Sequence, residues 1–228
     1  MFGNGSVRLW TLLFVAMIGI LATAGGVLRS NRRLSLMAPY ACRDRTSMGY
    51  LSALALVGGC VDAVLYTLSH TACQFVGQAL LWAVLLTCLN TDVQEWTVLD
   101  EVTIPGALCV AEWNLATGVN SAEFIVSGML IGAALILVIY FSTRGKIGLG
   151  DAKLFLSIGA MLGPAGDVGV LVLASTFGVL LFSPSFFSRS GRDDSMPIPF
   201  VPLLSAACLA WQLYGGDLVS WYGGLVQV

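Results

Sequence analysis

Charge is scarce in this sequence. Only 11% of the 228 residues are Asp, Glu, Lys or Arg, whereas soluble chains carry roughly 25%. Hydrophobic residues make up 57% of the chain and the mean hydropathy is +0.85, which excludes a soluble globular domain. No basic stripe interleaved with aromatic residues is present, so nothing in the sequence points to nucleic acid.

Histidine and paired cysteines are scarce as well. His70 is the only histidine; we expect it at the surface, on the outer side of the membrane, which disfavours a Ser-His or Cys-His catalytic group on the cytoplasmic side. The cysteines show no CxxC spacing and most lie in apolar runs: Cys42, Cys60, Cys73, Cys88, Cys109 and Cys208. We expect small buried side chains, with no metal site and no disulfide framework.

What the sequence has instead is a series of apolar runs close to the ~20 residues that cross a bilayer. They cover about 9–28, 48–68, 73–89, 102–115, 124–141, 152–162, 168–182 and 200–213. The expected fold class is therefore all-α, a polytopic integral membrane protein with about 6–8 transmembrane helices. Gly163-Pro164 separates two runs and predicts a tight turn between membrane segments.

The basic residues predict how these segments are oriented. Ten of the eleven Lys and Arg residues fall in the loops after the first, fifth and seventh runs, or just past Gly150; only Arg8 does not. Because cytoplasmic loops are enriched in Lys and Arg, these loops are expected in the cytoplasm. The same alternation places the polar stretch 90–101 on the cytoplasmic side, so Asp92 and Asp151 are expected at one membrane face.

These two acids stand at the edges of apolar runs. Asp151 follows Gly148-Leu149-Gly150, and Asp92 lies at the start of the stretch 90–101. Two carboxyl groups a few ångström apart cannot both ionise easily, so they share a proton, as peptide hydrolysis by an acid pair requires. Such a pair titrates as a unit, and neither acid is assigned a fixed role. The alternatives are an N-cap role for Asp151 at a helix beginning at Ala152 and an ordinary solvated acid at position 92.

The residues around both acids resemble one family. Gly148-Leu149-Gly150-Asp151-Ala152-Lys153-Leu154 is similar to the GxGD motif of the type IV prepilin peptidases. The upstream pattern matches too, in Asp92, Asp100, Thr103 and Pro105, with Asn114 after the next apolar segment. Ile198-Pro199-Phe200-Val201-Pro202 resembles the family's Ile-Pro-Phe-Gly-Pro, with Val201 in place of Gly. The resemblance covers roughly residues 75–215.

This resemblance implies a membrane aspartyl endopeptidase with Asp92 and Asp151 as the catalytic pair. Members are inner-membrane proteins of type IV pilus and type II secretion systems. They cut the short basic leader of prepilins or pseudopilins at the cytoplasmic face. Two domains are expected. Residues 1–72 hold the N-terminal membrane segments with a short basic cytoplasmic loop, and residues 73–228 form the catalytic membrane domain. No metal or cofactor is expected for the hydrolysis.

The loop after the first run departs from the family. Many members methylate the new N-terminus with S-adenosylmethionine and carry two CxxC pairs in this loop, whereas residues 29–46 hold only Cys42. No four-cysteine zinc site can form there. The sequence therefore favours a member without the tetracysteine loop, in which S-adenosylmethionine is a cofactor only if methyltransferase activity is retained.

Other residues are expected to support the acid pair. Asp100 is expected to have a structural role, capping the segment from Val102. Lys153 is expected either to tune the acid pair or to meet lipid phosphates, and Glu101 is a candidate for attracting the basic leader, as are Glu95 and Asp193. The remaining supporting positions are Gly148, Gly150, Pro105 and Pro199.

Three other functions stay open. A different GxGD membrane protease would place Tyr before its first acid, whereas Thr91 precedes Asp92 here. A transporter would need acids near the middle of the membrane, whereas both acids are expected at its edge. An inactive homologue serving as an assembly partner of a pilus or secretion system would not need both acids, which are present. The oligomeric state is left open.

Overall fold

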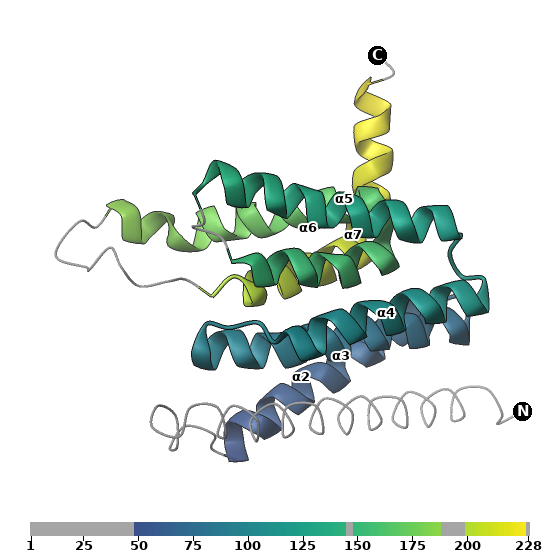
Figure 1. The fold of residues 1–228 in the computed structure, drawn as a ribbon, viewed down its shortest axis with the longest axis horizontal. Coiled ribbons are helices and arrows are strands. Elements are labelled where there is room, and N and C mark those ends of the chain that lie inside the picture. Colours follow the sequence, from purple (N-terminus) through teal and green to yellow (C-terminus); the bar gives the residue numbers. More distant parts are fainter. Residues whose placement is uncertain (1–47, 145–147, 188–198, 227–228) are drawn as a thin grey trace, which may run out of the picture.

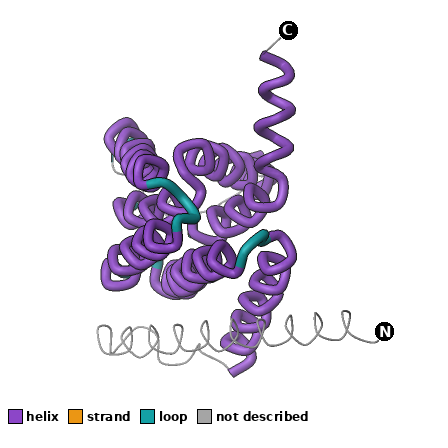
Figure 2. Tube along the Cα trace, turned by 90° about the vertical axis from the view of Figure 1, so that its right-hand side faces the viewer, coloured by secondary structure: helices purple, strands orange, loops and turns teal. Residues whose placement is uncertain are grey.

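The computed structural model describes residues 48–144, 148–187 and 199–226. Within these ranges every element is a helix (Figures 1 and 2): α2 (Met48–Leu68), α3 (Ala72–Glu95), α4 (Asp100–Thr117), α5 (Ala122–Ser142), α6 (Leu149–Phe187) and α7 (Val201–Val226). The first apolar run, the basic loop 29–46 and Asp193 lie outside the described residues. The all-α fold is confirmed.

Length and apolar composition support the membrane assignment. In the described ranges, three helical stretches are long and apolar enough to cross a bilayer, at 72–94, 122–142 and 149–181, and a shorter apolar helix covers 56–68. The third stretch is not straight, because Gly163 has φ 69° and ψ −175° and interrupts the helical geometry of α6. Only glycine adopts this region readily.

The chain reverses direction at Gly163, as the Gly163-Pro164 pair predicted. A methyl group added to Gly159 would lie 2.7 Å from Asp167 Oδ2, although eight residues of straight helix would separate the two positions by about 12 Å. α6 is therefore a helical hairpin whose two halves pack side by side. Its first half, 149–162, is about 21 Å long and is too short to cross a bilayer alone.

The helix ends that carry the two acids lie at one end of the bundle. Figure 1 shows the α3–α4 link, the start of α6 and the start of α7 together at the left of the view. The α4–α5 link lies at the opposite end. Residues far apart in the sequence thereby meet at one end of the bundle.

Short polar side chains explain where two of the helices begin. Thr71 accepts a hydrogen bond from the Gln74 N–H at the start of α3, and Ser121 accepts one from the Phe124 N–H at the start of α5. Such side chains satisfy N–H groups that have no partner inside the helix. α4 ends at Thr117, and its C-cap residue Gly118 takes the left-handed conformation with φ 68°.

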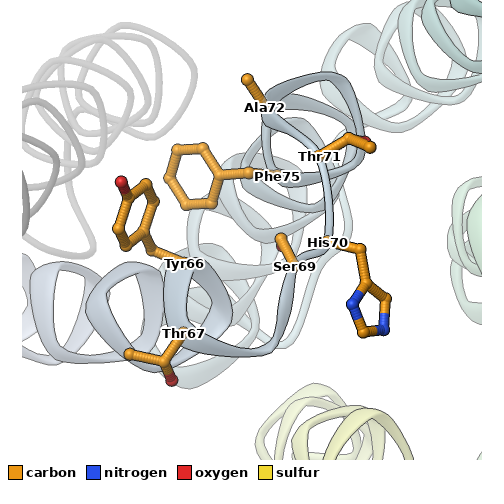
Figure 3. Close-up of a pocket in the computed structure, with 7 residues that line it drawn as sticks. All are labelled: Tyr66, Thr67, Ser69, His70, Thr71, Ala72 and Phe75. Carbon is orange, nitrogen blue, oxygen red and sulfur yellow. The ribbon is translucent and has the colours of Figure 1, made fainter.

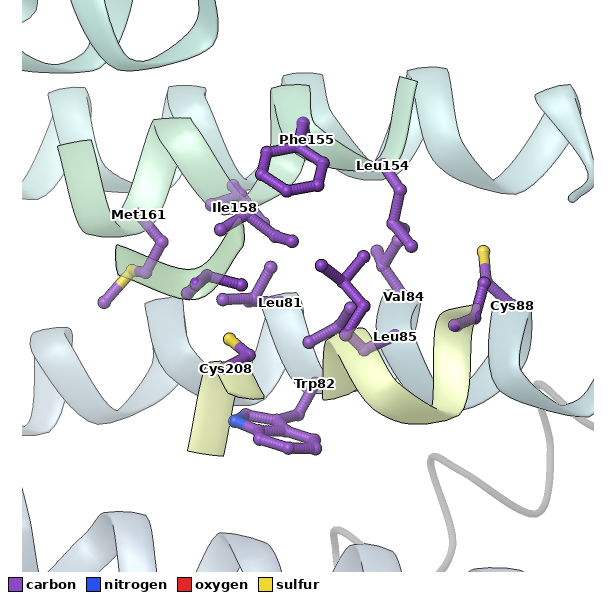
Figure 4. Packing of buried hydrophobic residues seen from close by; sticks show 14 of the residues in the cluster. Leu81, Trp82, Val84, Leu85, Cys88, Leu154, Phe155, Ile158, Met161 and Cys208 are labelled. Carbon is purple, nitrogen blue, oxygen red and sulfur yellow. The ribbon is translucent and has the colours of Figure 1, made fainter. Parts of the chain in front are cut away.

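The core is built mainly where α3, α6 and α7 meet (Figure 4). Leu81 and Leu85 of α3 face Phe155 and Ile158 of α6, with Cys208 of α7 beside them, and all are nearly or fully buried. α6 is central, because it packs against α5, α4, α7 and α3. Since lipid is as apolar as these side chains, close packing rather than escape from water holds such helices together.

Glycines allow the closest approach, between α5 and α6. A side chain at Gly128 of α5 would overlap the backbone of Gly159 in the first half of α6. Gly132, one turn further along α5, lies against the Asp167 carboxyl in the second half. Small residues at helix contacts in membranes serve this purpose, because they let backbones come together.

Candidate active site

Asp92 lies in the last turn of α3 and not in a loop. The expectation of a polar loop over 90–101 is wrong in its first half, because the helix continues through Glu95. Its C-cap residue is Trp96, which takes a left-handed conformation with φ 56° while its N–H donates to the Asp92 carbonyl at 3.0 Å. Polar side chains at the end of a membrane helix can reach water without breaking its backbone hydrogen bonds.

Asp151 lies in the first turn of α6. The helix begins at Leu149, so the alternative in which Asp151 is the N-cap of a helix starting at Ala152 is wrong. A methyl group on Gly150 would lie 2.7 Å from the Cβ of Val98, in the link between α3 and α4. A methyl group on Gly148 would meet Asp151 Oδ2 only at 3.8 Å. Gly150, unlike Gly148, is therefore required for close packing.

The structure brings the two acids together. The charge of Asp92 acts on the Asp151 carboxyl, and the thiol of Cys88, one turn before Asp92 on α3, is close enough to interact with both acids. Asp92 and Asp151 are each 7% exposed. Two carboxyl groups that feel each other's charge in a largely buried setting disfavour ionisation of both at once.

Asp92 also reaches the start of α7. Its Oδ2 accepts a hydrogen bond of 3.0 Å from the Val201 N–H, and the Phe200 N–H interacts with the same carboxylate. Val201 is the first residue of α7, so Asp92 satisfies N–H groups that a helix start leaves unpaired. The stretch from Pro199 to Pro202, which the sequence singled out as a motif, thus adjoins the acid pair. This contact was not foreseen.

Lys153 and Asp100 form an ion pair near the acids. The Lys153 Nζ lies 2.6 Å from Asp100 Oδ1, and the two side chains are 34% and 58% exposed. Asp100 is the first residue of α4, and no side chain caps this helix, whose N-cap residue is Leu99. The capping role expected for Asp100 is therefore wrong; Asp100 links α4 to α6 instead. Glu101 follows it, exposed on the first turn of α4.

The other expected supporting residues are spread more widely. Pro105 lies exposed inside α4, and Pro199 is half-buried just before α7. Asn114 is fully buried, and its side-chain amide donates to the Val110 carbonyl and contacts Met161 Sδ at 3.4 Å. Met161 is ten residues beyond Asp151 on α6, about 15 Å along the helix. Asn114 therefore ties α4 to α6 away from the acid pair.

Asp167 is a buried acid that the sequence reasoning missed. It is fully buried at the start of the second half of α6, and both its oxygens lack a hydrogen-bond partner in the described part of the protein. It faces Gly132 and Gly159, and its charge acts on the Cys208 thiol of α7. The signal available in the sequence was an acid three residues after Gly163-Pro164, within an apolar region.

A pocket of about 570 Å³ lies at the other end of α3 (Figure 3). It is lined by the α2–α3 turn and its neighbours: Tyr66, Thr67, Ser69, His70, Thr71, Ala72 and Phe75. His70 is exposed there, as expected. Twenty residues of helix, about 30 Å, separate Ala72 from Asp92. This pocket is therefore not part of the site formed by the acids.

The described residues contain no group of three His, Cys, Asp or Glu side chains placed to hold a metal ion.

Comparison with known proteins gives a consistent result. Residues 79–183 match the type IV leader peptidase family. The chain is 29% identical over 159 residues to a protein of Xanthomonas campestris pv. campestris, covering 65% of this chain and 53% of that protein. It is 27% identical over 184 residues to one of Bacillus subtilis, covering 79% and 72%, and 30% identical over 165 residues to one of Aeromonas hydrophila, covering 70% and 56%.

Each of these relatives is named prepilin leader peptidase/N-methyltransferase. The chain spans about half the length of the Xanthomonas and Aeromonas proteins. No solved structure matches the chain.

Proposed function

We propose that this protein is an aspartyl endopeptidase that removes the basic leader of type IV prepilins or pseudopilins, because residues 79–183 match the type IV leader peptidase family. The observation that carries this proposal is the meeting of Asp92 and Asp151, from the end of α3 and the start of α6, at one end of the bundle. Both acids lie in the residues matched to the family.

The chemistry needs one ionised and one protonated carboxyl group. The carboxylate takes a proton from water as the water oxygen bonds to the peptide carbonyl carbon, and the carboxylic acid gives its proton to the carbonyl oxygen. When the intermediate collapses, the C–N bond breaks. The leaving nitrogen takes the proton held by the first acid, and a hydroxyl of the intermediate returns a proton to the second. Water and two carboxyl groups suffice, so the proposal includes no metal and no organic cofactor.

The distribution of charge supports the proposed membrane face and substrate. The end of α5, which Arg144 follows, and the start of α6, which carries Lys153, lie at the same end of the bundle, and a Lys- and Arg-rich end is expected in the cytoplasm. We propose a location in the bacterial inner membrane with the acid pair facing the cytoplasm. A prepilin would place its apolar helix in the membrane and its leader junction at the acids. Glu101 is exposed in the first turn of α4, at this same end, and is proposed to attract the basic leader.

The proposal is limited to proteolysis. N-methylation appears in the names of the relatives, and in the family it uses S-adenosylmethionine with a cysteine-rich loop. Residues 29–46 carry only Cys42. The proposal therefore covers cleavage of the leader, and methylation of the product is left outside it.

The test is cleavage of a prepilin by the purified protein in detergent micelles. Asp92→Asn and Asp151→Asn are each expected to abolish cleavage at the leader junction, because each removes one member of the proton-sharing pair. Glu123→Gln is the matched control, since this exposed acid lies in the first turn of α5 at the opposite end of the bundle. Equal cleavage by wild type and both Asp variants would overturn the proposal and favour a transporter or an assembly partner.

A further inference from the structure

The two acids have different surroundings. Asp92 Oδ2 accepts the 3.0 Å hydrogen bond from the Val201 N–H and interacts with the Phe200 N–H. Among the described residues, no N–H or O–H group donates to the Asp151 carboxyl; the Asp151 N–H itself donates to the Gly148 carbonyl at 3.2 Å. Hydrogen bonds from N–H groups favour the ionised form of a carboxyl group.

We propose that the start of α7 holds Asp92 as the carboxylate that activates water, so that Asp151 carries the shared proton and donates it to the peptide carbonyl. This inference rests on the proposed function, because it assigns roles within the same acid pair. Val201 and Phe200 are positioning residues that act through their backbone N–H groups. They touch Asp92 and not the substrate.

Helix dipoles do not reverse this assignment. Asp92 lies at the C-terminal end of α3, which disfavours an anion, and at the N-terminal end of α7, which favours one, so these two contributions largely cancel. Asp151 lies at the N-terminal end of α6, which favours an anion there. A direct hydrogen bond to a charged group is about threefold stronger than a helix-end contribution. The N–H groups at Asp92 therefore decide which acid is ionised.

Few other ionisable groups face Asp92. Cys88 contributes a thiol from α3 and Asp151 a carboxyl from α6. The first turn of α4 carries Asp100, which is paired with Lys153 of α6, and Glu101, which is exposed. The 96–99 link and the first turn of α7 have no ionisable side chain. A change in pH dependence after loss of the Val201 N–H is therefore assigned to the acid pair.

The N–H group of Val201 can be removed with little harm to α7. Val201 is the first residue of α7, where proline is well tolerated because its missing N–H has no partner inside the helix. Val201→Pro deletes the donor to Asp92. Val201→Ala is the reference, since it shortens the same buried side chain and keeps the N–H. Replacing valine by its α-hydroxy acid analogue at position 201 exchanges the N–H for an ester oxygen without adding atoms.

The experiment measures prepilin cleavage against pH for wild type, Val201→Ala, Val201→Pro and the ester variant. Loss of the donor is expected to lower kcat about ten- to a hundredfold below Val201→Ala. It should also move the acidic limb of the pH–rate profile to higher pH, because the water-activating carboxylate then forms less readily. Identical pH profiles for the ester variant and Val201→Ala would overturn the inference, even if wild type cleaves normally.

A second measurement does not depend on activity. If Asp92 holds the start of α7, then Asp92→Ala should lower the thermal unfolding temperature more than Asp151→Ala. Val201→Pro should also lower the unfolding temperature relative to Val201→Ala. This difference should disappear when Asp92 is replaced by Ala, because the carboxylate that accepts the Val201 hydrogen bond is then absent. Equal effects of the two Asp substitutions would overturn the inference. A wild type that fails to cleave prepilins but shows this coupling would refute the proposed function alone.

Discussion

The contact between Gly150 and Val98 gives the sharpest prediction about the site. A methyl group at position 150 would lie 2.7 Å from Val98 Cβ and 3.2 Å from its Cγ2, whereas carbon atoms in contact stay about 3.5–4.0 Å apart. Gly150→Ala therefore forces the start of α6 away from the α3–α4 link by roughly 1 Å. Asp151 is the next residue and moves with it, away from Asp92.

The size of the effect follows from this displacement. Inserting a methyl group into a well-packed contact lowers the free energy of unfolding by about 1–3 kcal/mol. A misplacement of about 1 Å at a catalytic group lowers the rate about a hundredfold. We expect Gly150→Ala to lose about two orders of magnitude in kcat/KM for prepilin cleavage, with the protein still folded in micelles.

The assay is the initial rate of leader removal, paired with thermal unfolding of each variant. Gly148→Ala is the comparison, because its methyl group meets Asp151 Oδ2 only at 3.8 Å; its loss of activity should be at least about tenfold smaller. Val98→Gly should restore activity to Gly150→Ala. Val98→Ala should not, because it keeps the Cβ atom that makes the closest contact.

Two outcomes would refute this reasoning. Gly150→Ala with the activity of wild type would mean that the start of α6 is not held against the link. Equal rescue by Val98→Ala and Val98→Gly would mean that the Cβ contact is not the cause of the loss.

Three further predictions concern stability in detergent micelles, measured by thermal unfolding. Lys153→Ala should lower the free energy of unfolding by less than about 1 kcal/mol, because the ion pair of Lys153 with Asp100 is partly exposed. The decrease should be smaller still at high salt, which screens the pair. A larger decrease that does not depend on salt would contradict this prediction. Gly163→Ala should destabilise by at least about 1–3 kcal/mol, because position 163 has φ 69°, and unchanged stability would mean that the α6 hairpin does not need this conformation. Gly132→Ala should destabilise by about 1–3 kcal/mol, since its methyl group would lie 2.8 Å from Asp167 Cγ; the double variant with Asp167→Ala should lose less than the sum of the two, whereas simple additivity would show that the residues do not touch.

The fold class could be read from the sequence because it depends on local properties. A bilayer requires apolar runs of about 20 residues with internally satisfied backbone groups, and this requirement is visible in composition and length alone. The run 48–68 and α2 (Met48–Leu68) coincide. The reversal at Gly163 was also visible, because Gly-Pro pairs at the end of a run rarely continue a helix.

Helix ends were less predictable. Polar residues after position 89 indicated a loop, yet α3 runs on to Glu95, since a helix emerging from a membrane keeps its backbone hydrogen bonds while its side chains reach water. The acids and the supporting Lys153 could be singled out by position. Lys153 was expected to tune the acid pair or to meet lipid phosphates, and its ion pair with Asp100 in the structure was not predicted.

By itself, the sequence determined that this is a membrane-embedded helical protein and that Asp92 and Asp151 stand at the ends of their segments. Those properties depend on residues close together in the chain. Only the tertiary structure decided that Val201, 109 residues after Asp92, donates to its carboxylate, and that Asp167 is buried against glycines with no hydrogen-bond partner among the described residues. These contacts depend on how α6 and α7 pack against α3 and α5, and such packing is set by shape complementarity between distant surfaces, which no local pattern encodes.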